Sequence, residues 1–142
     1  MSVEKNKALV RRLVEALNTR SWGVLDEVMA PDYVDHYALP SQKPGREGYE
    51  EAFISATNAF PDLQFTIEDM IAEGDKVVAR MTFSGTHRGE VMGIAPTNKR
   101  VTYAHIHIMR IVRGKVVEDW GFGDRLTSLQ QLGVVLPIRL GK

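Results

Sequence analysis

The stretch of sequence that decides the fold is KRVTYAHIHIMRIVRGKVVEDWGFGD, residues 99–124. Apolar and β-branched residues lie on both sides of Arg113-Gly114-Lys115, a short turn typical of a β-hairpin. Side chains at positions i and i+2 of a strand point to the same face, so His105 and His107 share a face. The stretch therefore predicts two antiparallel strands that carry a pair of imidazoles and end in an acid, Asp124.

Two more strands are predicted before the hairpin, at residues 63–74 and 76–87, on either side of the turn Glu73-Gly74-Asp75. A loop at residues 88–98 joins the second of them to the hairpin. The second half of the chain is therefore predicted to be a meander of antiparallel strands.

The first half of the chain is predicted to be helical. Leucines recur every four residues in the first helix, which gives it an apolar face. A serine can cap a short second helix at residues 22–30, and a proline ends the third helix. The leucines are Leu9, Leu13 and Leu17, the capping serine is Ser21, and the proline is Pro61. The segment YVDHY, residues 33–37, is predicted to be extended.

Helices followed by antiparallel strands are typical of the α+β class. The packing we expect lays the helices across one face of a curved sheet, and a strongly curved sheet leaves a pocket beneath them. A last helix, residues 125–132, is predicted to end at Gly133, a residue suited to the left-handed conformation. We expect one domain spanning residues 1–142.

The composition excludes several classes of function. The 18 basic residues balance the 18 acidic ones, so no overall field favours nucleic acid or an anionic membrane. The absence of cysteine excludes disulfides, thiolate zinc sites and cysteine nucleophiles. No run of about 18 apolar residues predicts a membrane span. We expect a cytoplasmic protein that binds neither nucleic acid nor membranes.

Short motifs along nearly the whole chain resemble those of the SnoaL-like polyketide cyclases, or ester cyclases, within the nuclear-transport-factor-2-like (NTF2-like) fold group. The motifs are YVDH at 33–36, PG at 44–45, FPDL at 60–63, EGDKVVAR at 73–80, SGTHRGEVMGIAPTNKRV at 84–101, IMRIVRGKVVEDW at 108–120, Asp124 and QQLG at 130–133. The family's loop usually reads PPTGK where this chain has APTNK. Asparagine also tolerates a positive φ, so Asn98 is expected to preserve the turn.

The resemblance implies both a fold and a reaction. The fold is an NTF2-like cone of three N-terminal helices on a strongly curved, mostly antiparallel sheet, followed by a short C-terminal helix. The outer face of the sheet usually joins copies of the chain, here expected to be a homodimer or homotetramer. The characterised cyclases close the last ring of an aromatic polyketide ester by an intramolecular aldol condensation. They use no metal or cofactor, and a pocket aspartate is their acid/base.

Asp124 is the residue that the resemblance indicates as this acid, because it completes the pattern Trp120-x-x-x-Asp124. Alternation along the strand places Phe122 on the same face, and apolar neighbours raise the pKa of a carboxyl group towards working pH. Residue preferences alone favour an N-cap of the helix at residues 125–132. The two roles can coexist. The same alternation puts Asp119 on the opposite face, which counts against it as a partner.

The histidine pair, His105 and His107, allows three interpretations. It can belong to a metal site if a carboxylate and another ligand converge on it, but we expect no metal. It can be a hydrogen-bonded structural pair. The interpretation we favour is a pocket role, in which neutral imidazoles hydrogen-bond a substrate carbonyl or relay protons near pH 7.

The remaining pocket predictions come from the extended segment and from large apolar side chains. In the extended segment Asp35 is expected to orient His36 or to satisfy loop backbone. His87 is expected either to fix the neighbouring loop or to touch substrate. The residues expected to bind substrate are His36, Tyr33, Trp120, Phe53, Met109 and Phe83.

The function predicted is a cofactor-independent aldol condensation on a polyketide-like carbonyl or ester substrate, small and apolar or aromatic. Its catalytic residues are expected to be Asp124, His107 and His105. One alternative is a ketosteroid-isomerase-like isomerase or a hydrolase in the same pocket, which needs a second inward acid such as Asp35 or Asp119. The other is a non-catalytic domain that binds a small ligand, because fold does not imply chemistry.

Overall fold

A computed structural model describes residues 2–136 of the chain as four helices and one five-stranded sheet. The elements are, in order, α1 (Val3–Thr19), α2 (Trp22–Val28), β1 (Met29–Asp35), α3 (Gly45–Ala59), β2 (Gln64–Glu73), β3 (Lys76–Thr86), β4 (Arg100–Val112), β5 (Lys115–Gly123) and α4 (Arg125–Leu132). The strand order is β1-β5-β4-β3-β2, with β1 parallel to β5 and the other pairs antiparallel. The predicted α+β architecture is confirmed.

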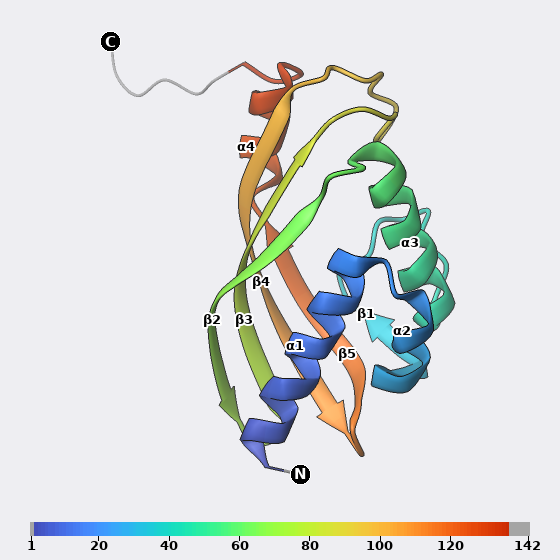
Figure 1. Ribbon diagram of the computed structural model, residues 1–142, viewed down its shortest axis with the longest axis vertical. Helices are drawn as coiled ribbons and strands as arrows, with labels where there is room; N and C mark the ends of the chain where they lie inside the picture. Colours follow the sequence, from blue (N-terminus) through green and yellow to red (C-terminus); the bar gives the residue numbers. More distant parts are fainter. Residues whose placement is uncertain (1, 137–142) are drawn as a thin grey trace.

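The first three helices cover one face of the sheet, which twists along its length (Figure 1). The fourth helix packs against β4 near the C-terminal end of the described chain (Figure 1). No helix within residues 2–136 combines the length and the apolar character needed to cross a membrane.

The main core lies between α1 and the inner face of the sheet. Leu13 and Leu17 of the predicted stripe are buried, whereas Leu9 is only half-buried at its edge. They pack in one cluster with side chains of β3 and β4, including Val77 and Met109. Each fully buried leucine contributes roughly 1.5–3 kcal/mol of hydrophobic stabilisation, so this contact holds α1 on the sheet.

The helix ends follow the sequence signals except at the two ends of α2. Gly133 adopts the left-handed conformation after α4, with φ 81°, as predicted. Asn98 also has a positive φ, 58°, so the turn expected from the family loop is preserved. Ser21 precedes α2, but its hydroxyl bonds to Thr19 at 2.8 Å and does not cap the helix. The second helix is also shorter than predicted, because residues 29 and 30 begin β1.

A β-bulge near the start of β5 determines which of its side chains face the helices. Ile111 pairs with Val116 and Arg110 pairs with Glu118, so Val117 is an extra residue without a partner on β4. An extra residue reverses the alternation of side chains beyond it. Every later position of β5 therefore faces opposite to what simple alternation from Val116 predicts.

The outer face of the sheet carries exposed apolar side chains. Ile71, Ile106 and Ile108 are among them. The expected association of copies through this face stays a prediction.

Candidate active site

A cavity of about 240 Å³ lies between the inner face of the sheet and helices α1 and α3. Most of its wall is apolar or aromatic, with Leu17 from α1 and Phe53 from α3 as examples. The ionisable side chains that line it are Asp35, Tyr37, Tyr49, Tyr103, His105, His107, Asp119 and Arg125. An apolar pocket with a few convergent polar groups is the usual form of a small-molecule site.

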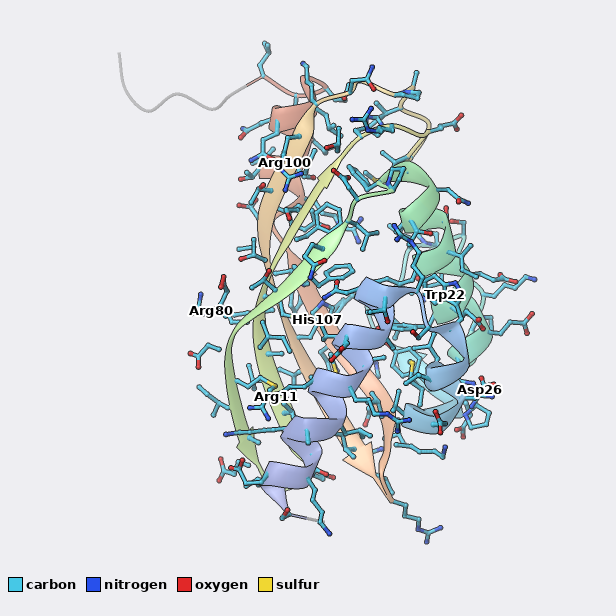
Figure 2. All side chains as sticks on the ribbon, viewed as in Figure 1. Arg11, Trp22, Asp26, Arg80, Arg100 and His107 are labelled. Carbon is cyan, nitrogen blue, oxygen red and sulfur yellow. The ribbon has the colours of Figure 1, made fainter. Side chains whose placement is uncertain are left out.

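Three of these polar side chains form a continuous hydrogen-bonded chain. His107 Nδ1 lies 3.0 Å and 3.1 Å from the two carboxylate oxygens of Asp119, and His107 Nε2 lies 3.1 Å from His105 Nδ1. Figure 2 shows His107 among the side chains between the sheet and the helices. Asp119 is only 4% exposed, so its interaction with His107 takes place away from bulk water.

The order of partners determines where the protons lie. A carboxylate only accepts hydrogen bonds, so His107 Nδ1–H must donate to Asp119. With His107 neutral, its Nε2 is then an acceptor, and His105 Nδ1–H donates to it. His105 Nε2 is left with a lone pair that has no hydrogen-bond partner in residues 2–136, although the atom is buried.

Burial keeps His105 neutral. Desolvation, followed by the nearby His107, lowers the pKa of His105 to about 4. A neutral His105 at pH 7 is consistent with the proton arrangement above.

Two buried tyrosines surround the carboxylate of Asp119. The Tyr33 hydroxyl donates to Asp119 Oδ2 at 3.3 Å, and the Tyr49 ring packs edge-on against Tyr33 with 5.2 Å between ring centroids. Burial and the charge of Asp119 raise the pKa of both hydroxyls far above the usual range. Both tyrosines therefore remain protonated donors, and Oδ1 of Asp119 accepts only from His107 among the described residues.

A glycine opposite His107 makes room for the imidazole. Gly121 pairs with His107 across β4 and β5. A Cβ atom at position 121 would lie 2.4 Å from His107 Nδ1, much closer than atoms can approach. The glycine therefore allows the ring to reach Asp119, two residues earlier on β5.

Comparison with known proteins identifies the family. The family model described as SnoaL-like polyketide cyclase matches residues 7–132. The chain belongs to the SnoaL-like polyketide cyclase family. A curated relative, the aklanonic acid methyl ester cyclase DauD of Streptomyces sp. strain C5, is 33% identical over 135 residues, which cover 91% of this chain and 82% of DauD.

Two solved structures share the SnoaL-like fold along nearly the whole chain. TsrD from Streptomyces laurentii superposes with a TM-score of 0.88 at 31% identity, covering 95% of this chain and 99% of TsrD. AclR from Streptomyces galilaeus, a proposed hydroxylase, superposes with a TM-score of 0.83 at 31% identity, covering 98% of this chain and 87% of AclR.

Several predicted site residues line the cavity of this SnoaL-like domain. They are His105, His107, Phe53, Phe83 and Met109. The shared face of the two histidines is confirmed, and β4 also turns Tyr103 and Met109 towards the cavity. The roles of these residues in binding or catalysis are proposals, taken up below.

The predicted pocket position of Asp124 is wrong. Its exposed carboxylate caps α4, accepting from the Thr127 hydroxyl at 2.6 Å and from the Thr127 backbone N–H at 3.1 Å. These two hydrogen bonds lower the pKa of Asp124. Asp124 lies outside the cavity wall, whereas Asp119, which alternation seemed to exclude, lies within it. The cause is the bulge at Val117, which turns Asp119 inwards.

His36 and Trp120 also lie outside the cavity, contrary to prediction. Their rings stack with 4.6 Å between centroids, and His36 Nε2 lies 2.7 Å from Glu118. Val34 of β1 aligns with Glu118 of β5, so the β1 side chains on the cavity side are Tyr33 and Asp35. Tyr33 does not line the cavity itself, but its hydroxyl donates to Asp119.

Sequence reasoning missed the importance of Asp119 and of the glycines opposite the histidines. Gly121 and Gly123 pair with His107 and His105, and small residues facing two rings are a signal that the sequence contains. His87, the other open prediction, is fully buried and binds the loop: its Nδ1 lies 3.0 Å from the Thr97 hydroxyl. Residues 2–136 contain no cluster of three or more metal-binding side chains.

Proposed function

We propose that this chain is a cofactor-independent cyclase that catalyses an intramolecular aldol condensation on a polyketide-like carbonyl or ester substrate. The observation that carries the proposal is the buried carboxylate of Asp119 on the wall of an apolar cavity, hydrogen-bonded to His107 and Tyr33. Asp119 takes the role that the sequence interpretation gave to Asp124.

The first step is removal of a proton from the carbon between a ketone and an ester. Oδ1 of Asp119 takes the proton, and the electrons of the C–H bond enter the enolate. The enolate carbon then attacks a second carbonyl of the same molecule and forms the new ring bond. The resulting alkoxide takes the proton back from Asp119, which returns the carboxylate to its starting state.

The residues around Asp119 supply orientation and hydrogen bonds. His107 and Tyr33 hold the carboxylate in one position, which is what a general base needs to meet a fixed C–H bond. Tyr49 and Tyr103 line the cavity as protonated hydroxyls, because burial raises the pKa of each, and they can donate to the enolate oxygen. His105 donates to His107 Nε2 and so supports the tautomer of His107 that binds Asp119.

The reaction assigned to relatives supports this choice without identifying the substrate. DauD is named as an aklanonic acid methyl ester cyclase, and its match covers most of both chains. A carbon acid between two carbonyls is already acidic, so one carboxylate with neutral donors is enough to ionise it. AclR has the same fold and a different proposed activity, so the test must read out carbon-acid chemistry directly.

The test is deuterium exchange at the acidic carbon of small aromatic β-keto esters, followed by NMR. Wild type should accelerate exchange over buffer, and Asp119→Asn should lose roughly 10²–10⁴-fold of that acceleration, the usual contribution of a general base. Asp124→Asn is the matched control: it makes the same change five residues away and should exchange like wild type. A wild-type protein that binds the esters without accelerating exchange would instead be a ligand-binding domain.

A further inference from the structure

The cavity opens through a rim of exposed apolar side chains. Tyr37 and Phe122 line it while 51% and 63% exposed, and their rings lie 4.4 Å apart between centroids. Leu39 beside them is 43% exposed. Large apolar side chains gathered at a cavity entrance and open to water indicate a binding surface that continues beyond the cavity.

The enclosed volume is small for a polycyclic ligand. The cavity measures about 240 Å³, below the roughly 300–1,000 Å³ typical of small-molecule sites. A substrate with several fused rings therefore places only its reacting end inside. The rest of the molecule must extend over the rim, against Tyr37 and Phe122.

Arg125 brings a positive charge to this entrance. It is the first residue of α4 and lines the cavity. Within residues 2–136 it belongs to none of the ion pairs. The carboxylate of its neighbour Asp124 accepts two hydrogen bonds from Thr127. Burial raises the pKa of Tyr103, and the Arg125 charge acts in the opposite direction.

We propose that Arg125 is a specificity-determining residue that binds a carboxylate on the part of the substrate at the cavity entrance, while the reacting dicarbonyl end lies at Asp119. The planar, two-forked guanidinium matches a carboxylate with two parallel hydrogen bonds. This inference rests on the proposed cyclase function and adds the charge of the substrate to it.

The test compares two flat probes that differ only in charge, anthraquinone-2-carboxylate and anthraquinone-2-carboxamide. Calorimetry at low salt should show that wild type binds the carboxylate roughly fivefold more tightly, since the site is partly exposed. Arg125→Gln should bind both probes equally. The matched control Arg11→Gln removes an exposed charge from α1, outside the cavity wall, and should keep the preference (Arg11 is labelled in Figure 2).

Equal binding of the two probes by wild type, a preference that survives in Arg125→Gln, or binding of neither probe would overturn the inference. Its failure is distinguishable from failure of the proposed function. Deuterium exchange on a neutral β-keto ester tests Asp119, because such an ester has no carboxylate for Arg125 to bind. Asp119→Asn should in turn keep the charge preference while losing exchange.

Discussion

Two aspartates five residues apart, one in the middle of β5 and one directly after it, have opposite surroundings. Asp119 is 4% exposed and accepts hydrogen bonds from His107 and Tyr33 inside the protein. Asp124 is exposed and accepts from the first turn of α4. A buried carboxylate must be held by donors, whereas an exposed one is free to stabilise a helix end. The comparison shows that the side of the sheet on which each residue lies, and not residue type, separates the aspartate of the cavity from the helix cap.

The largest expected effect comes from removing the donor to the buried aspartate. His107→Leu leaves the Asp119 carboxylate buried with Tyr33 as its remaining partner, so the free energy of unfolding at pH 7 should fall by roughly 3 kcal/mol. Urea denaturation measures it. The double variant Asp119→Leu/His107→Leu, which has no unpaired charge, should recover most of the loss. Unchanged stability of the single variant would mean that the Asp119 carboxylate is as well solvated as that of Asp124.

The second effect tests the space that Gly121 leaves for His107. Gly121→Ala places a Cβ atom against the imidazole and should move it by a fraction of an ångström to an ångström. A displacement of that size should lower kcat roughly 100-fold with a smaller change in KM. Gly23→Ala, in α2 with open space around it, is the control and should retain wild-type turnover. Equal kcat in all three proteins would remove the positioning role from Gly121.

The third effect is a pH dependence of stability from His105. Its pKa is about 4 in the folded protein against an ordinary value of 6.5, so between these values the unfolded chain binds more protons. The free energy of unfolding should therefore fall as the pH drops from 6.5 to 4, with roughly 2 kcal/mol of the fall due to His105. Denaturation at several pH values measures it. His105→Gln should flatten the slope, and a slope equal to that of the wild type would contradict the assignment.

The smallest effect belongs to the exposed aspartate. Asp124→Ala removes the two hydrogen bonds with Thr127 and should lower the Tm by roughly 3 °C. Deuterium exchange should stay at the wild-type rate. If this variant lost most of its exchange while Asp119→Asn remained active, the general base would be Asp124 and not Asp119.

Local patterns were sufficient to predict most of the fold. The leucine repeat of α1, the turns at Gly74 and Gly114 and the end of α4 at Gly133 all depend on neighbouring residues. The positive φ of Asn98 belongs to the same group. For this reason the predicted helices and strands appear where expected, with small shifts at their ends.

The face of β5 could not be predicted, because it depends on a contact between two strands. Val116 and Val117 are both apolar, and nothing in the sequence marks Val117 as the extra residue. Alternation counted from Val116 therefore assigned Asp119 to the outside. On β4, which has no bulge between His105 and Met109, the same reasoning placed the histidines correctly.

The extended segment was misjudged for a related reason. Its pairing with β5 is parallel and joins residues more than eighty positions apart, which a local pattern does not reveal. That pairing directs Tyr33 towards Asp119 and leaves His36 stacked on Trp120. The polar character of His36 suggested a binding role that its position does not support.

The hydrogen-bonded chain of Asp119, His107 and His105 comes entirely from β4 and β5, while Tyr37 and Leu39 at the entrance come from the segment after β1. Part of the entrance is thus encoded apart from the proposed proton-transfer hairpin, while Phe122 and Arg125 lie in or next to that hairpin. We expect mutations at residues 37–42 to change which molecules enter and to leave the hairpin intact. These residues are therefore the place to begin directed evolution of the substrate range.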